Sequence, residues 1–200
     1  MKKPRINTAA LANAKLVESN PSTVNNFKRL FAYVIDWYAA SMLAGIPVVF
    51  IYSIFFKDLE ITQNITKLPM PYSIIAGLIA IVVYLAYFIV VPLKIYPGQT
   101  FAKKIMNIKI VKDNDEAVDF WSLFKREAIG VMIVEGYIAA SSSYFHQIMN
   151  MCIGRDLSTI YVYVFGIITA LSMLWACASP KRKMFHDYIG KTKLVISEDD

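Results

Sequence analysis

Charged residues are scarce in this sequence. They make up 18% of its 200 residues, whereas 56% of the residues are hydrophobic, and soluble domains average about 25% charged residues. So few charges cannot cover a surface that faces water, and they gather between long stretches that almost lack them. This distribution argues against an ordinary soluble domain and predicts a single integral membrane domain.

Residues typical of catalytic and metal sites are also sparse. The two cysteines, Cys152 and Cys177, lie 25 positions apart, largely along one predicted helix. That separation is too long for a disulfide, and the spacing matches no metal site. No Ser-His-Asp order, His/Cys cluster or phosphate loop appears in the sequence. We therefore expect a protein that is not an enzyme and that holds neither a metal nor a cofactor.

Four stretches are long and apolar enough to cross a bilayer, which needs about 20 residues. Each must be helical, because a backbone amide surrounded by lipid is satisfied only within its own segment. We expect an all-α integral membrane protein, with a polar cytoplasmic tail at 1–26, a four-helix domain at 27–196 and an acidic end at 197–200. The connection at 141–156 is expected to form a small extracytoplasmic cap. The predicted spans are 30–56, 72–93, 123–145 and 158–179.

The distribution of Lys and Arg predicts the orientation. Of the 21 Lys and Arg residues, 18 lie in the two tails or in and beside the linker between the second and third spans, and only Lys57, Lys67 and Arg155 lie on the other side. Basic residues accumulate on the cytoplasmic side of membrane proteins, so we expect both termini in the cytoplasm of a multi-pass cell-membrane protein. The same distribution explains the net charge of +6 without nucleic acid. The expected partners are anionic lipid headgroups, with a second copy or another membrane protein as further candidates.

The linker at 94–122 contains two short structural signals. Phe101 and Ile105 stand at helical spacing beside basic residues, which is typical of a short amphipathic helix on a membrane surface. Residues 108–111 then read as a short strand, and residues 192–196 read as a second one. These strands either pair beneath the membrane or run separately along its surface.

Asp36 is the most informative residue of the sequence. It lies seven positions after Arg29, or ~10.5 Å along one helix. If Arg29 lies at the headgroup level, Asp36 lies within the hydrocarbon, where a carboxylate is costly unless it is paired or hydrated. Asp36 is therefore either a proton- or cation-binding group or one half of a buried pair that fixes one helix to another.

Glu135 is a second acidic residue inside a predicted span, while Arg126 and Glu127 lie nearer the cytoplasmic end of that span. Asp36 and Glu135 could form a relay for protons or small cations, since burial would allow them to exchange protons near neutral pH. Alternatively, pairing with an arginine would keep each carboxylate charged.

The dipeptide His186-Asp187 closes a basic run after the fourth span. Such a pair in the cytoplasm is more often a solvated or capping element than a site.

Three separated elements resemble a known family. Residues 29–36 follow an Arg-Leu-x-Ala-x-x-x-Asp pattern, Gly98-Gln99-Thr100 leads to Lys103-Lys104, and His186-Asp187 is followed by Gly190 and Thr192. Together these elements resemble the RDD family of bacterial membrane proteins, which is named for one arginine and two aspartates, here matched by Arg29, Asp36 and Asp187. Lys191 departs from the adjacent Gly-Thr of the family pattern. Some members are described as similar to sodium/proton antiporters.

Two functional hypotheses follow. In the first, the protein is a small transporter or a proton- or cation-coupled protein, in which Asp36 or Glu135 binds the ion. The residues that pair with these carboxylates or control access to them are then Arg29, Arg126, Glu127, His186 and Asp187. In the second, these residues lock the helices of a non-transporting protein, whose basic cytoplasmic face binds lipid or a partner protein.

Overall fold

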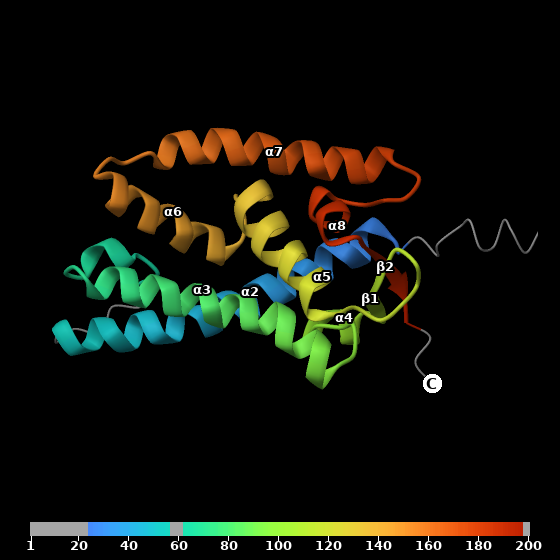
Figure 1. Ribbon diagram of the computed structural model, residues 1–200, viewed down its shortest axis with the longest axis horizontal. Coiled ribbons are helices and arrows are strands. Elements are labelled where there is room, and N and C mark those ends of the chain that lie inside the picture. The colour runs from blue at the N-terminus through green and yellow to red at the C-terminus, as the bar shows by residue number, and fades with distance from the viewer. Residues whose placement is uncertain (1–23, 57–61, 198–200) are drawn as a thin grey trace, which may run out of the picture.

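The computed structural model describes residues 24–56 and 62–197. The predicted tail at 1–26 and the acidic end at 197–200 therefore lie almost wholly outside the described residues. Three long helices dominate the fold: α2 (Asn26–Phe55), α3 (Tyr72–Val90) and α7 (Ser158–Ala178) (Figure 1). A π-helical turn, η2 (Val91–Ile95), extends α3, and a short turn, η1 (Ile65–Lys67), precedes it. All three long helices are apolar and long enough to cross a membrane, as predicted for the first, second and fourth spans.

The third predicted span is not one straight helix. It begins with α5 (Phe120–Phe124) and η3 (Lys125–Glu135), breaks at Gly136, and resumes as α6 (Ala140–Ile153) after a bend of 58°. Gly136 has a φ of +49°, a left-handed conformation that ends helices and favours glycine. Because α6 occupies most of residues 141–156, the expected cap there is wrong. The fold thus has three candidate spans, or four if the bent pair crosses as one.

A small two-stranded sheet lies at one end of the helices (Figure 1). Strand β1 (Ile108–Lys112) pairs antiparallel with β2 (Thr192–Ile196), with Ile110 opposite Leu194. This confirms the prediction that the two strands pair with each other. Two short helices adjoin the strands: α4 (Phe101–Ile105) leads to β1, and α8 (Phe185–Gly190) leads to β2. The chain therefore brings the middle linker and the C-terminal segment together.

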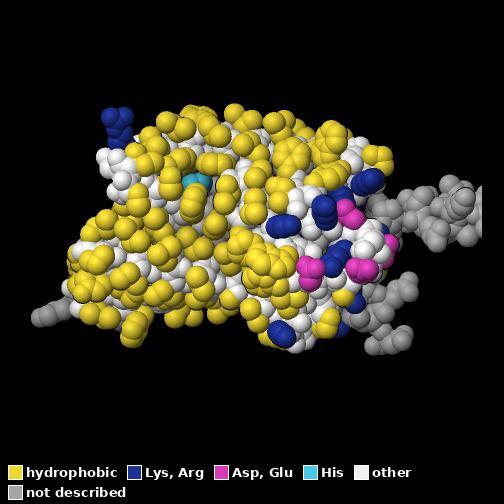
Figure 2. Space-filling view, viewed as in Figure 1, with side chains coloured by type: hydrophobic (Ala, Val, Ile, Leu, Met, Phe, Trp, Pro, Cys, Tyr) yellow, Lys and Arg dark blue, Asp and Glu magenta, His cyan; other side chains and the backbone are white. Residues whose placement is uncertain are grey.

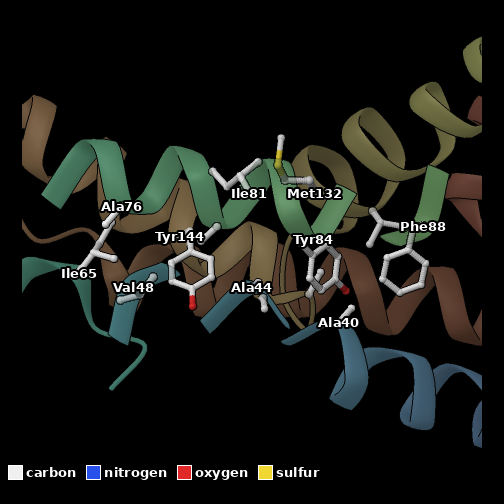
Figure 3. Packing of buried hydrophobic residues seen from close by; sticks show 14 of the residues in the cluster. Ala40, Ala44, Val48, Ile65, Ala76, Ile81, Tyr84, Phe88, Met132 and Tyr144 are labelled. Atoms are coloured by element: carbon white, nitrogen blue, oxygen red, sulfur yellow. The ribbon is translucent and has the colours of Figure 1, made fainter. Parts of the chain in front are cut away.

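The main apolar core lies where α2, α3 and α6 meet (Figure 3). Small side chains such as Ala40, Ala44 and Ala80 are fully buried there, so the helices approach closely around the larger Tyr84 and Tyr144.

The outer faces of the long helices are apolar as well. Phe50, Val82 and Leu174 are each about two-thirds exposed, and Figure 2 shows hydrophobic side chains over most of the visible surface. Charged side chains gather at the end that carries the sheet (Figure 2). Soluble monomers rarely expose continuous apolar patches larger than a few hundred Å². This apolar belt around long helices is that of a multi-pass integral membrane protein.

Candidate functional site

Asp36 is fully buried on α2 and accepts four hydrogen bonds. Its Oδ1 accepts from the Tyr87 hydroxyl at 2.7 Å and from the backbone N–H of Ala102 at 3.0 Å. Its Oδ2 accepts from the Thr100 hydroxyl and from Lys103 Nζ, the latter at 3.1 Å. Thus α4 and the residue before it bind the carboxylate that α2 presents.

The geometry around Asp36 favours the buried-pair interpretation. A carboxylate offers about four lone-pair sites, and all four are occupied, with Lys103 supplying the opposite charge. A cation could bind Asp36 only by displacing Lys103. The short helix that contains Lys103 was expected to lie on the membrane surface, but the Lys103 side chain is buried against Asp36.

The second cluster is a continuous chain of polar contacts, which we call the Arg126 network. It joins α2, η3 and α8 at the charged end of the molecule. Its members are Arg29, Arg126, Glu127, Glu135, His186 and Asp187. The structure therefore brings together all of the predicted site residues except Asp36.

Asp187 is the centre of charge pairing in the network. It is fully buried, and its carboxylate contacts Arg126 and accepts from Arg29 Nη2 at 3.0 Å. Burial by itself would raise the pKa of Asp187, but the charges of Arg126 and Arg29, together with a hydrogen bond from the Met184 N–H, outweigh it and hold that pKa well below its usual range. Asp187 also accepts from the Met184 N–H at the start of α8, at 2.9 Å. The expectation of a capping role is confirmed, whereas the expectation of a solvated pair is wrong.

Arg126 has no direct access to solvent water, with only 4% of its surface exposed. Besides Asp187, it donates from Nε to Glu127 at 3.1 Å and from Nη1 to the Thr192 hydroxyl at 3.0 Å. Its Nη2 lies 3.0 Å from His186 Nε2. The arginine thereby fixes η3 to both α8 and β2.

Close packing of α8 on η3 depends on a glycine. A Cβ added at Gly130 would lie 2.6 Å from His186 Cβ and 2.7 Å from its Cα, closer than real Cβ atoms come. Gly130 is thus the residue that lets the α8 backbone approach η3.

Glu135 and His186 form a hydrogen-bonded pair whose proton can be placed from its neighbours. His186 Nδ1 lies 2.9 Å from Glu135 Oε2. Arginine only donates hydrogen bonds, so His186 Nε2 accepts from Arg126, and Nδ1 carries the proton and donates to Glu135. Glu135 Oε1 also accepts from the Ser172 hydroxyl at 2.6 Å and from the His186 N–H at 3.2 Å. This arrangement fits a neutral histidine beside an ionised carboxylate.

The Arg126 network carries one negative charge that it does not compensate internally. With His186 neutral, the network holds three carboxylates, those of Glu127, Glu135 and Asp187, and two guanidinium groups, those of Arg29 and Arg126. Burying an unbalanced charge is costly. One proton on the Glu135–His186 pair would neutralise the network.

The break at Gly136 frees backbone carbonyls inside the bundle, and side chains from other helices satisfy them. Thr169 donates to the Glu135 carbonyl at 2.5 Å, and the Trp37 indole donates to the Ile138 carbonyl at 2.8 Å. Non-helical backbone at membrane depth is tolerated where it is buried in this way.

A cavity of about 280 Å³ lies between α2, η3 and α7 beside the break. Glu135 and His186 form part of its wall, while Leu30, Ile138 and Met173 supply apolar lining. Water or a small solute in this cavity would therefore contact the pair directly. Within residues 24–56 and 62–197, no cluster of three or more His, Cys, Asp or Glu side chains is placed to hold a metal ion.

Comparisons with known proteins identify the family. A search of curated proteins and a search of solved structures each found no match. The sequence model of the RDD family matches residues 23–191, a range that includes Asp36 and the whole Arg126 network. The chain therefore belongs to the RDD family.

Proposed function

We propose that this protein is a small proton-coupled transporter of the cell membrane, in which the Glu135–His186 pair binds and releases the proton. The proposal is carried by the uncompensated negative charge of the Arg126 network, located where the third span is broken. Discontinuous membrane helices are a recurring feature of substrate and ion sites in transporters. An ionisable residue at such a break is best explained by function, because its burial is costly.

The proposed topology has four spans, with η3 and α6 together forming the third. Both termini and the sheet face the cytoplasm, in agreement with the distribution of Lys and Arg. Four spans are few for a transport pathway, so we propose that the protein works as an oligomer.

Proton binding offers a way to change the packing of α8. If His186 becomes doubly protonated, its Nε2 becomes a donor and can no longer accept from Arg126. Asp187 Oδ1, 3.6 Å from that nitrogen, is then the available acceptor. Protonation would thus move a contact from Arg126 to Asp187 and bias the position of α8 against η3. In this mechanism Asp36 and Lys103 hold α4 in place and do not bind the transported ion.

Transport by purified protein in liposomes tests the proposal. With a pH-sensitive dye inside the vesicles and an imposed sodium or potassium gradient, the wild type should change the internal pH. Glu135→Gln should reduce the initial rate at least tenfold. Glu116→Gln is the matched control, because the Glu116 side chain is 65% exposed at the charged end, and it should leave the rate unchanged. A wild type that moves no protons, or a Glu135→Gln variant that moves them normally, would refute the proposal.

A second candidate function, binding of anionic lipid without transport, has one observation in its favour. Phe101 and Ile105 of α4 are each more than half exposed beside Lys104, an arrangement suited to insertion among anionic headgroups. Under this alternative, thermal stability in detergent should rise with added anionic lipid, and Glu135→Gln should leave that increase intact.

A further inference from the structure

Four buried side chains at the junction of α2, α3 and α6 carry hydroxyls with no hydrogen-bond partner among the described residues. They are Ser41, Tyr84, Ser141 and Tyr144, and none is more than 7% exposed. A buried hydroxyl without a partner costs about 1–3 kcal/mol. Four of them at one junction therefore need a common explanation, and bound water is the usual partner of such groups.

Two of these hydroxyls lead from Asp36 toward the opposite end of the bundle. Tyr84 precedes Tyr87, whose hydroxyl binds Asp36, by three residues or ~4.5 Å along α3. Ser41 follows Asp36 by five residues or ~7.5 Å along α2. Because α2 leaves the charged end and α3 returns to it (Figure 1), both steps point away from that end.

Helix α6 continues the same polar path. Ser141, Tyr144, Gln147 and Asn150 follow one another at every third position. Each is rotated by about 60° from the one before it, so this row, which we call the polar seam, turns half way around the helix. Figure 3 shows the Tyr144 and Tyr84 rings within the same buried cluster, each with its hydroxyl toward α2.

The seam ends in an open polar pocket of about 750 Å³. Gln147 and Asn150 line this pocket together with Gln63. The Gln63 amide also reaches inward and donates to the backbone carbonyl of Ser41 at 3.4 Å. One hydrogen bond thus joins the pocket to the backbone at Ser41, five residues after Asp36.

The inner end of the path lies close to the Arg126 network. Tyr84 interacts electrostatically with Tyr33, Glu127 and Asp36. Tyr33 in turn interacts with Glu127 and Glu135 and lines the 280 Å³ cavity with Glu135. Tyr33 thus shares the cavity with the proposed proton-binding pair.

We propose that water molecules fill the seam and bind Ser41, Tyr84, Ser141 and Tyr144, and that protons pass along them between the pocket and Glu135. The second half of this proposal rests on the proposed transport function, whereas water binding does not. Each hydroxyl both donates and accepts, so each can exchange a proton with a neighbouring water without a change in its charge.

Radiolytic hydroxyl labelling of the purified protein tests water binding, because radicals formed from bound water modify the side chains beside it. After correction for intrinsic reactivity, Tyr84 and Tyr144 should be labelled at least fivefold more than Leu123, which is fully buried among apolar side chains. Labelling of both tyrosines at the level of Leu123 would overturn the proposal, whatever the protein transports.

Removal of the hydroxyls tests the proton route. The double variant Tyr84→Phe/Tyr144→Phe should unfold at the wild-type temperature or above, because no described protein group loses a partner, and its proton transport should fall at least tenfold. Tyr163→Phe, at a residue that is 67% exposed on α7, is the control. Transport at the wild-type rate in the double variant would refute the route. A wild type that is labelled but moves no protons would refute the proposed function and the route together, and leave water binding supported.

Discussion

Asp187→Asn isolates the energetic role of the buried charges. Asparagine preserves the size of the side chain but removes the negative charge that Arg29 and Arg126 share. Removal of one partner of a buried ion pair costs about 3–5 kcal/mol. Arg126 would keep Glu127, whereas Arg29 would keep only the backbone carbonyl of Arg182. Since one of the two guanidinium groups remains paired, we expect the lower end of that range, about 3 kcal/mol.

Thermal unfolding of the purified protein in detergent measures this loss. For a chain of this length, 1 kcal/mol corresponds to roughly 2–4 °C, so the unfolding temperature should fall by roughly 6–12 °C. Asp115→Asn is the matched control. Asp115 also pairs with a lysine, Lys193, at 2.7 Å, but its side chain is 71% exposed, and such surface pairs contribute little. If Asp187→Asn shifts the unfolding temperature no more than Asp115→Asn does, the network does not stabilise the fold as argued.

Three further predictions concern the same region. Asp36→Asn leaves Lys103 buried without its counter-charge, so it should lower the unfolding temperature by as much as Asp187→Asn. Asp36→Asn/Lys103→Met removes both charges and keeps an acceptor oxygen at position 36, so it should restore part of the loss; a double variant no better than the single one would contradict the pairing. The pKa of Asp187 is held below its unfolded value of about 3.9. The ionised Asp187 should therefore contribute its full stabilisation above about pH 3.9 and lose it as the pH falls below that value. Unfolding temperatures measured from pH 7 to pH 3 should fall less steeply in Asp187→Asn than in the wild type. Gly130→Ala should displace α8, because the new Cβ would overlap His186, and should expose the α8 backbone amides to faster hydrogen exchange; exchange at the wild-type rate would show that the contact is not tight.

Local sequence patterns were sufficient to predict the long helices. The apolar stretches later found as α2, α3 and α7 could be recognised from length and lack of charge, because transfer of a long uncharged segment into lipid is favourable wherever the rest of the chain lies. The strands at 108–112 and 192–196 could be located for a similar reason, since alternation and turn residues are local signals. Their pairing was one of two arrangements that the sequence left open.

The partners of the acidic residues could not be predicted from local sequence patterns. Lys103 lies 67 positions after Asp36, and Arg126 lies 61 positions before Asp187. The position of Asp36 within a predicted span indicated that a partner was needed but not which residue would supply it, and Asp187 was expected to be solvated or to cap a helix. The break at Gly136 could not be predicted from the sequence either. A glycine permits either a close helix contact or a left-handed turn, and only the surrounding packing selects one of them.

The sequence by itself therefore determined that this is a multi-pass membrane protein of the RDD family, and which of its acidic residues would be costly to bury. Only the tertiary structure decided that Asp36 is paired with Lys103, that Asp187 joins two arginines, and that Glu135 meets His186 at the break between η3 and α6. The physical reason is that the cost of burying a charge depends on the residue alone, whereas its compensation depends on groups that folding brings within a few ångströms.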